Sequence, residues 1–399
     1  MSKLPARSVY FLWAGLSSLF FSTYGTLSAI YRIEVAGLDA LELILLGTAL
    51  ELSVFVFELP TGIVADVYSR RVSVIIGMVL IGLGFILEGA LPVFAFMLVA
   101  QVVWGLGVTF ESGAVDAWIS DEIGEAKANA AFLRSAQIAQ FMSLVGIGLA
   151  TVLAQLFLGL PLIVGGIGFL LLALLLIVVM PETGFERESD NSPLTALGST
   201  FQAGVALVKR RPLVLTIFVI TAILGASSET FDRLYAAHFI EDIGVPDVFS
   251  LPVWFGLIGA IVSLVSILAT EIVRRRVVVN QGAVLARVLF ALTLVLSICI
   301  LGFAVVGQFY LALAFYGSAV LLRIVNAPLQ RAWLNLELEP KTRATVFSMN
   351  GQMDALGQVL GGPILGVLAR LYGMPLAFVL SGVLLLPALY LYRRSLKLK

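Results

Sequence analysis

The sequence is poor in the residues from which most enzyme and metal sites are built. Its 399 residues include one cysteine, Cys299, and one histidine, His238. A single cysteine excludes a disulfide framework and a cysteine-ligated metal site. One histidine is too few for a metal site built from several histidines, and it argues against a catalytic triad. Because we also find no nucleophile–base set, the sequence predicts a protein that is not an enzyme and needs no cofactor.

Charged residues are scarce as well. They make up 13% of the chain, about half of the share that an ordinary soluble domain carries. The formal net charge is zero, which argues against nucleic acid as a partner. Apolar residues reach 60%, and the excess must face something other than water. The composition therefore predicts an all-α membrane protein whose main partner is the lipid bilayer.

Twelve stretches of the sequence are long and apolar enough to cross a bilayer, which takes roughly 20 residues. The first stretch is longer than the core of a signal peptide and more stretches follow it, so we interpret it as a permanent helix. The predicted spans are residues 9–30, 41–65, 72–91, 93–120, 130–157, 160–180, 212–237, 251–273, 281–304, 307–333, 345–371 and 375–392.

Lysine and arginine are distributed unevenly between the connecting segments. Cytoplasmic loops of membrane proteins carry an excess of both residues. With the N-terminus inside, the cytoplasmic segments hold most of those in the connecting segments, including Lys3, Arg7, Lys127, Lys341 and the basic tail 393–399. The outer loops carry little beyond Arg32 and Arg370. We therefore expect a multi-pass protein of the inner (cell) membrane with both termini in the cytoplasm.

The longest polar stretch, residues 181–211, joins the sixth and seventh spans and divides the chain into two six-helix bundles, 1–180 and 212–399. Its beginning, PETGFERESDNSP, has the composition of a flexible linker. Residues 194–209 fit either an amphipathic helix lying on the inner membrane surface or a simple tether.

The two halves repeat at an offset of 215 residues, which aligns spans four and five with spans ten and eleven. Six spans separate the copies, so the repeat is parallel, as expected for two halves that rock about a central site. The matching residues that are hardest to attribute to chance are Trp118 with Trp333, Phe132 with Phe347, and Gln137 with Gln352.

The loop after span two resembles the signature loop of the major facilitator superfamily through Gly62, Asp66, Arg70 and Arg71. The basic residue usual after the aspartate is missing, and a serine replaces the second glycine. The resemblance implies twelve helices in two parallel repeats, transport by alternating access, and an inner gate at this loop. Asp66 would accept hydrogen bonds from Arg70 and from amides at a helix N-terminus. The family's acid at the end of span four corresponds to Asp121.

Within the superfamily, the chain resembles the twelve-span drug–proton antiporters that export tetracycline- or macrolide-like compounds. The segments FESGAVDAWISDEI in span four and SMNGQMDALGQVLGGPILG in span eleven carry this likeness. Two departures concern the antiporters' own motifs. Gln101 stands where span four would carry an arginine, and span five keeps Gly146 and Gly148 without the proline. The resemblance implies antibiotic resistance by proton-coupled multidrug efflux.

Three ionisable residues fall near the middle of predicted spans, where a charge is costly and indicates function. At about 1.5 Å per residue, Glu111 lies roughly 15 Å above the end of span four, and Arg323 and Asp354 lie at similar depth. In the family that the chain resembles, spans four and ten line the central cavity. We expect Glu111 to exchange a proton or bind a cationic group, with Arg323 and Asp354 opposite. The alternative is a structural Arg323–Asp354 ion pair and a Glu111 satisfied by hydroxyls.

Other charges have weaker assignments. Asp116 and Arg331 are equivalent in the repeat, and we expect them either to attract each other across the inner gate or to be separate solvated charges. Glu51 and Glu58 in span two are further candidates for protonation or for structural roles. An outer gate, or a hydrated rim, is predicted from Glu229, Asp232 and Arg233.

Aromatic residues in spans one and four could line the cavity or simply pack between helices; these are Tyr24, Trp104 and Phe110. We assign no role to His238, which falls in a predicted outer loop. Trp118 and Trp333 are expected to be interfacial or packed between helices.

The leading functional hypothesis is export of small hydrophobic compounds in exchange for protons. Two alternatives stay open: proton-coupled uptake of a small metabolite, and flipping of lipids or lysolipids. A non-transporting receptor is the least favoured hypothesis. The expected ligands are a small-molecule substrate and protons, and the expected state is a monomer, because the repeat already supplies both halves.

Overall fold

The computed structural model describes residues 3–185, 211–276, 281–338 and 343–396. Within these ranges the regular structure is helical and contains no strand. Eleven helical segments of this part are long and apolar enough to span a membrane. The remaining long helix, α1, carries more hydroxyl side chains than the others. The predicted amphipathic helix at 194–209 lies outside the described residues.

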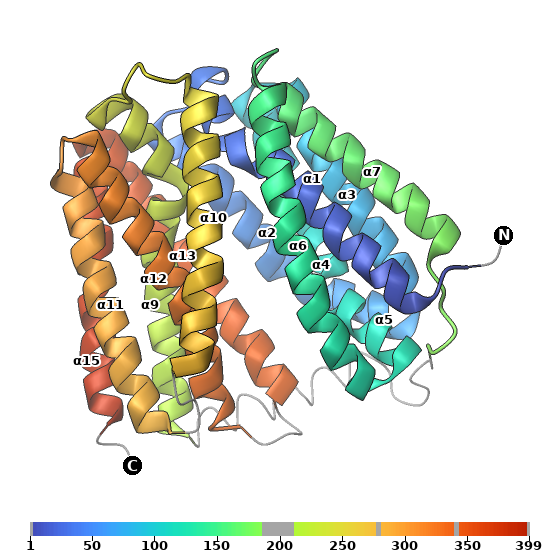
Figure 1. The fold of residues 1–399 in the computed structure, drawn as a ribbon. Helices are drawn as coiled ribbons and strands as arrows, with labels where there is room; N and C mark the ends of the chain where they lie inside the picture. The colour runs from blue at the N-terminus through green and yellow to red at the C-terminus, as the bar shows by residue number, and fades with distance from the viewer. Residues whose placement is uncertain (1–2, 186–210, 277–280, 339–342, 397–399) are drawn as a thin grey trace. The chain divides into compact units, whose positions relative to one another are not determined.

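The helices fall where the apolar stretches predict them, within a few residues at most ends (Figure 1). In the first half they are α1 (Ala6–Glu34), α2 (Ala40–Val67), α3 (Arg70–Ala90), α4 (Phe94–Glu111), α5 (Ala114–Ile123), α6 (Glu125–Leu153) and α7 (Leu160–Val179). In the second half they are α9 (Pro212–Ala237), the π-helix η1 (His238–Ile243), α10 (Leu251–Arg276), α11 (Gly282–Val305), α12 (Phe309–Asn335), α13 (Arg343–Tyr372), α14 (Met374–Val383) and α15 (Leu386–Ser395).

Two of the predicted spans are not single helices. Span four breaks at Ser112–Gly113, between α4 and α5, where Gly113 has a left-handed φ of 72°. Span twelve breaks between α14 and α15, just before a proline in the first turn of α15. A window of apolar residues predicts neither break, because hydropathy does not report backbone angles.

The helices form two compact units. Unit 1 consists of Met1–Leu38, Ala49–Pro193 and Val248–Ala260, and unit 2 of Asp39–Thr48, Leu194–Asp247 and Ile261–Lys399. These limits differ from the predicted division of the sequence by two short segments, the start of α2 and the start of α10. Each unit therefore takes one piece of chain from the other half of the sequence.

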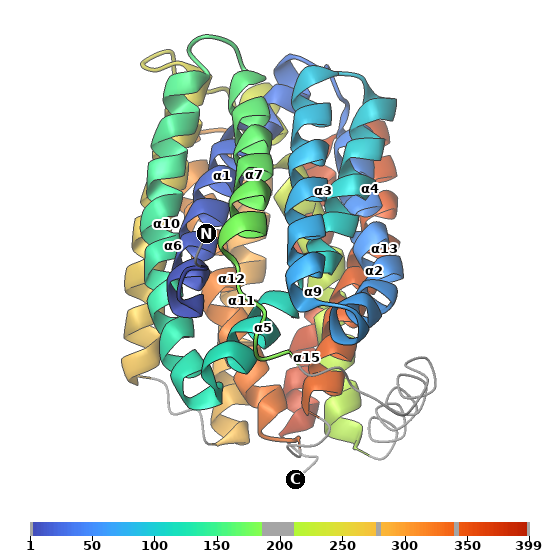
Figure 2. The same cartoon turned by 90° about the vertical axis from the view of Figure 1, so that its right-hand side faces the viewer.

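In unit 1, α1 packs against α6 and α7, and α3 packs against α4 and α7 (Figure 2). Small residues allow this close approach. A Cβ atom on Gly146 of α6 would lie 2.4 Å from the carbonyl oxygen of Leu19 on α1. Gly77 of α3 and Gly107 of α4 face each other in the same way, each within 3 Å of the other's carbonyl oxygen if it had a Cβ. Backbone contact thus holds the helices around the site described below.

In unit 2, α9 packs against α13, and α11 packs against α12, α14 and α15. A hydrophobic cluster that includes Phe218, Trp333 and Tyr392 fills the space between them. Trp118 of unit 1 and Trp333 of unit 2 are both buried, so the structure supports packing and not an interfacial position. In unit 1, large apolar side chains such as Leu133 and Phe141 of α6 are exposed.

Candidate functional site

Unit 1 contains a cavity of about 520 Å³ between α1, α3, α4, α6 and α7. This volume lies within the range of small-molecule sites, about 300–1,000 Å³. Its walls are mostly apolar and aromatic, with hydroxyl groups from Tyr10, Ser17, Ser18 and Ser135. Glu111 is the only one of its lining residues that carries a charge. The cavity therefore combines a largely hydrophobic interior with a single carboxylate.

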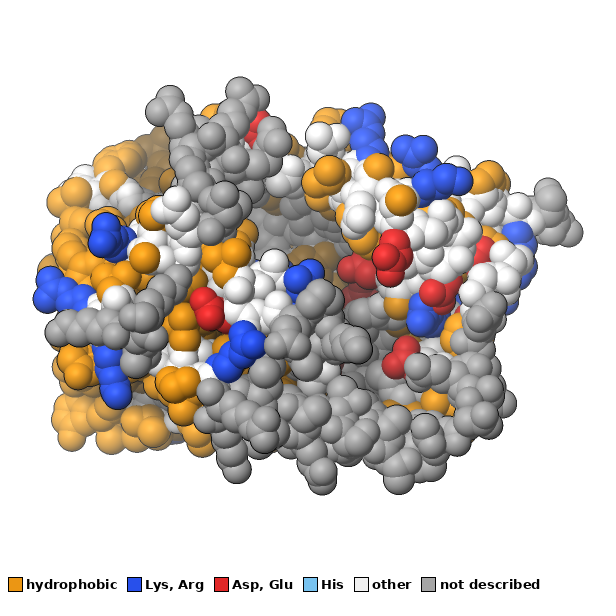
Figure 3. Space-filling view, turned by 90° about the horizontal axis from the view of Figure 1, so that it is seen from below, with side chains coloured by type: hydrophobic (Ala, Val, Ile, Leu, Met, Phe, Trp, Pro, Cys, Tyr) orange, Lys and Arg blue, Asp and Glu red, His pale blue; other side chains and the backbone are white. Residues whose placement is uncertain are grey.

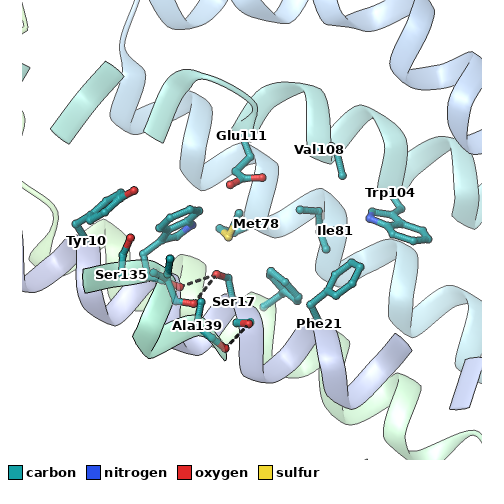
Figure 4. Close-up of a pocket in the computed structure, with 15 residues that line it drawn as sticks. Tyr10, Ser17, Phe21, Met78, Ile81, Trp104, Val108, Glu111, Ser135 and Ala139 are labelled. Carbon is teal, nitrogen blue, oxygen red and sulfur yellow. Dashed lines mark hydrogen bonds between the residues drawn. The ribbon is translucent and has the colours of Figure 1, made fainter. Parts of the chain in front are cut away.

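Glu111 is the last residue of α4, directly before the break. The Ser112–Gly113 step interrupts the helical hydrogen bonds, and irregular backbone in a membrane helix is tolerated where it lines a cavity. Glu58 of α2 contacts this break, because its Oε1 accepts a hydrogen bond of 3.2 Å from the Ser112 hydroxyl. Gly77 of α3 packs against the Glu111 backbone and Cβ. Figure 4 shows the Glu111 carboxylate directed into the cavity.

The two ends of the cavity differ in chemistry (Figure 4). Toward one end lie Tyr10 and Ser135, and the Tyr10 hydroxyl donates a hydrogen bond of 3.0 Å to Asp116 of α5. At the other end the rings of Phe21 and Trp104 lie 6.0 Å apart. The indole N–H groups of Trp13 and Trp104, both on cavity-lining residues, are buried and lack an acceptor within the described part of the chain.

The three aromatic residues that could line the cavity or pack between helices take different positions. Trp104 lines the cavity as expected, whereas Tyr24 and Phe110 do not. Tyr24 is 1% exposed and its hydroxyl donates to Glu88 of α3 at 2.8 Å. The reason is a pair of buried charges that the sequence analysis missed, Arg32 and Glu88, whose Nε and Oε1 atoms lie 2.8 Å apart. Glu88 is an acid inside the predicted span 72–91, so the rule that singled out Glu111 would also have found it.

The predicted inner-gate loop lies between α2 and α3. Arg70 forms an ion pair with Asp121 at the end of α5, so the structure brings together two of the predicted gate residues. Arg71 donates from its side chain to the carbonyl oxygen of Ile177, at 2.5 Å. Asp66 lies in the last turn of α2, and Gly62 lies in open space one turn earlier. The lower end of the molecule in Figure 1 carries charged side chains of both signs (Figure 3).

The segment after α7 is bound to this loop, although its composition predicts a flexible linker. Glu182 accepts hydrogen bonds from the Ser69 hydroxyl and from the Arg71 backbone amide, the latter at 2.9 Å. A carboxylate at the N-terminus of α3 is stabilised by the free amides there. Trp118 donates to the Pro181 carbonyl oxygen at 2.7 Å, and Glu122 accepts from Thr183.

Unit 2 contains a second group of charges on α9, α12 and α13. The alternative of an Arg323–Asp354 ion pair is corrected, because Arg323 instead forms a bidentate pair with Asp232 at 2.5 and 2.6 Å. The ring of Phe231 lies 5.3 Å from the same guanidinium. Asp354 accepts from Gln358 of its own helix at 3.1 Å.

The other α9 charges are also paired. Arg233 bonds Glu229 at 3.1 Å, and Glu229 is fully buried. A hydrated rim is therefore wrong for Glu229, although Asp232 is 43% exposed. Gly47 of α2 makes room for this pair, since a Cβ there would collide with both side chains.

The remaining predicted residues are placed as follows. His238 is buried in η1 and not in a loop; its ring bonds Asp242 at 2.7 Å and the Phe303 carbonyl oxygen at 3.0 Å. Glu51 lies partly buried on α2 and does not line the cavity. Asp116 and Arg331 are both exposed and belong to different units, so their attraction stays a prediction. The part of the chain that the structure covers has no cluster of three or more metal-ligating side chains.

Comparison with known proteins adds to this picture. An uncharacterized MFS-type transporter of Bacillus subtilis (strain 168), YxaM, is 23% identical over 396 residues, which cover 98% of this chain and 96% of that protein. The nucleoside transporter NupG has a similar fold, with a TM-score of 0.77, 13% identity and coverage of 99% of this chain and 100% of that chain. A bacterial homolog of the human lysosomal transporter Spinster gives a TM-score of 0.77 at 14% identity, covering 100% and 98%.

At these identities the solved structures support the fold alone. A family profile, by contrast, matches most of the chain directly, over residues 10–326, and its description is Major Facilitator Superfamily. This match, together with the relative's description as a transporter, indicates a membrane transporter and not an enzyme. The chain belongs to the Major Facilitator Superfamily.

Proposed function

We propose that the protein is a secondary active transporter that exports small hydrophobic compounds by alternating access, in exchange for protons. The observation that carries the proposal is the cavity of unit 1, in which Glu111 supplies the only carboxylate among lining residues that are mostly apolar and aromatic. Such a wall suits a hydrophobic body, and its hydroxyl and indole N–H groups can orient a few polar atoms of the substrate.

Glu111 is the proposed coupling residue. A carboxyl group held away from water favours its neutral form, and a neighbouring positive charge favours its ionised form. A proton and a cationic group of the substrate would therefore compete for the same carboxylate. The break after α4 places Glu111 beside an interrupted stretch of helix, and discontinuous helices form the binding sites of many transporters.

The loop residues Gly62, Asp66, Arg70, Arg71 and Asp121 are proposed as the inner gate. The Arg70–Asp121 ion pair supports this role, since it joins the start of α3 to the end of α5 with side chains only about a quarter exposed.

Asp116 and Arg331 are proposed to complete the inner gate, and Glu229, Asp232 and Arg233 to form an outer gate. Both termini are proposed to lie in the cytoplasm of a cell that carries the protein in its inner membrane, and the working unit is proposed to be the monomer.

The test is proton-driven flux in proteoliposomes. The vesicles receive an imposed proton gradient and a panel of lipophilic cationic and zwitterionic compounds, and wild type is compared with Glu111→Gln. We expect gradient-dependent movement that the substitution abolishes. Glu34→Gln is the matched control, because Glu34 is an exposed acid at the end of α1 outside the cavity. Flux that ignores the gradient and survives Glu111→Gln would refute the coupling role.

A second candidate function is favoured by Arg323. Its guanidinium is 28% exposed, forms a two-pronged carboxylate pair and lies over Phe231. Arginine in this geometry suits a carboxylate or a phosphate, as in an imported metabolite or a lysolipid head group. Accumulation of a fluorescent lysolipid in one leaflet would favour a flippase, and gradient-driven uptake of small organic acids would favour the importer.

A further inference from the structure

Behind the aromatic end of the cavity, four polar side chains form a hydrogen-bonded network in unit 1. Arg32 donates from Nε to Glu88 at 2.8 Å and from Nη2 to the Tyr24 hydroxyl at 2.9 Å. That hydroxyl donates to the second Glu88 oxygen at 2.8 Å, and Gln101 Nε2 donates to the same oxygen at 2.6 Å. The network joins α1, α3 and α4.

The network is buried and carries no net charge. All four side chains are less than 10% exposed, and the single positive charge of Arg32 meets the single negative charge of Glu88. None of the four residues lines the cavity. Both Glu88 oxygens are already occupied by protein donors, so the network offers a substrate no free charge.

What the network touches is a wall of the cavity. The Tyr24 ring is stacked on Phe85 at 3.6 Å, with the two planes 4° apart, and meets the Trp104 ring edge-on at 5.5 Å. Phe85 also meets Trp104 edge-on, at 5.2 Å. Gln101 lies three residues before Trp104 on α4, almost one helical turn away. Trp104 is therefore held from behind by Tyr24 and Phe85, and its own helix is tied to Glu88 through Gln101.

Stability alone does not explain this arrangement. Removing two charges from water is costly, and a buried ion pair is often no more stabilising than apolar side chains of similar volume. What a hydrogen-bonded charge pair adds is direction, because each bond has a preferred distance and angle. Apolar side chains would fill the same space without fixing the rotation of Tyr24 or the register of α4.

We infer that Arg32, Glu88, Tyr24 and Gln101 are positioning residues that hold the Trp104 ring at the cavity wall and thereby set a preference for aromatic over aliphatic ligands. The inference rests on the proposed function, in that it takes the cavity of unit 1 as the ligand site. It assigns the network to selectivity, whereas Glu111 is assigned to coupling.

The experiment measures binding of two monovalent cations to the purified protein by equilibrium dialysis. Tetraphenylphosphonium presents aromatic faces, and tetrabutylammonium presents aliphatic chains. The readout is the ratio of their two dissociation constants. A partly unfolded variant loses binding of both ligands in proportion, so a merely structural role leaves this ratio unchanged. The variants are Trp104→Ala, the charge-neutral double variant Arg32→Gln/Glu88→Gln, and Tyr24→Phe.

We expect wild type to prefer tetraphenylphosphonium, and Trp104→Ala to reduce that preference by about threefold to tenfold, the range of aromatic and cation–π contacts. The double variant should reduce it in the same way. Tyr24→Phe removes one hydroxyl and keeps the ring, so it should fold even if the double variant does not, with a smaller reduction. Ser22→Ala is the control, because it removes a 2.6 Å hydrogen bond between α1 and α6 that does not involve Trp104.

The outcomes separate the two proposals. If Trp104→Ala lowers the preference and neither the double variant nor Tyr24→Phe does, the positioning role is wrong and the proposed cavity stands. If wild type binds neither cation, or Trp104→Ala leaves the preference unchanged, the cavity is not the site and both proposals fall. A reduction in Ser22→Ala equal to that in the network variants would also overturn the inference.

Discussion

At the scale of single residues, Arg32 and Glu88 form a buried ion pair in which each charge depends on its partner. Their side chains are 7% and 1% exposed, so removing one partner leaves the other charged in a medium that cannot solvate it. We expect Glu88→Gln alone to lower the free energy of unfolding by about 3–5 kcal/mol. Arg32→Met combined with Glu88→Leu should recover most of that loss. Chemical unfolding in detergent measures the free energy of unfolding of the single and of the double variant.

The Arg70–Asp121 pair is the comparison for this prediction. Its side chains are 21% and 28% exposed, and pairs open to solvent contribute about 0–1 kcal/mol. Asp121→Asn should therefore change unfolding much less than Glu88→Gln. Equal losses in the two single variants, or a double variant as unstable as Glu88→Gln, would contradict the account of Glu88 as a charge that needs its partner.

The residue scale also marks where the sequence could predict the site and where it could not. Glu111 was identifiable because an acid in an apolar stretch has few structural explanations. The partner of Arg323 was not, because Asp232 and Asp354 are both acids at plausible depth and only the helix packing decides which one reaches it. The position of Tyr24 stayed open between lining and packing for a similar reason, since a sequence does not tell which side of α1 meets Glu88.

At the scale of helices, two glycines of α6 make a matched pair. A Cβ on Gly146 would lie 2.4 Å from the Leu19 carbonyl oxygen of α1, whereas a Cβ on Gly148 would meet nothing within 4 Å. Gly146→Ala must push α1 and α6 apart, so we expect it to cost roughly 1–3 kcal/mol. Gly148→Ala should be neutral or slightly stabilising, because alanine favours a helix. Thermal unfolding measures the stability of the two variants. Equal changes in stability would contradict backbone contact at Gly146.

The break between α4 and α5 supports a second prediction about an element. Gly113 has φ of 72° and open space around it, so a substitution there acts through backbone strain alone. Gly113→Ala should cost roughly 1–2 kcal/mol and slow transport by shifting the α4 end that carries Glu111. Gly113→Asn should be tolerated better, because asparagine adopts left-handed angles. Flux and unfolding of both variants test this; identical behaviour would argue that the break needs no left-handed residue.

Most helices followed from composition because a bilayer fixes the length of an apolar stretch. The exceptions have local causes. Residues 93–120 average out as one apolar stretch although Glu111, Ser112 and Asp116 lie close to Gly113, so a hydropathy window does not mark the break. Residues 181–185 are polar and contain a proline and a glycine, which is typical of a linker, yet Glu182 and Thr183 are bound by groups far away in the sequence. Long-range hydrogen bonds of this kind leave no local signature.

At the scale of the whole molecule, the fold limits the function without choosing the substrate. Transporters named for nucleosides and peptides share this fold at 13% and 15% identity, so the substrate has to be argued from the residues of the site. Here those residues are Glu111 among aromatic side chains in unit 1 and the Arg323–Asp232 pair in unit 2. The two sets favour different substrates, and the flux experiment decides between them.

Orientation is the property of the whole molecule on which the gate assignments depend. The excess of lysine and arginine in alternate loops predicts that the α2–α3 loop is cytoplasmic and the α6–α7 loop external. Cys299 is the single cysteine and is buried, so Cys299→Ser gives a background for one-cysteine variants. Tyr68 and Leu156 lie in the two loops and are 70% and 77% exposed, which makes Tyr68→Cys and Leu156→Cys a matched pair.

A membrane-impermeant maleimide should label Leu156→Cys in intact cells and Tyr68→Cys only after the cells are opened. Because the two sites are almost equally exposed in the fold, a difference in labelling reports the side of the membrane and not burial. The reverse labelling pattern would show that the protein has the opposite orientation in the membrane. Asp66, Arg70 and Asp121 would then close the outer side, and the proposed direction of transport would have to be reversed with them.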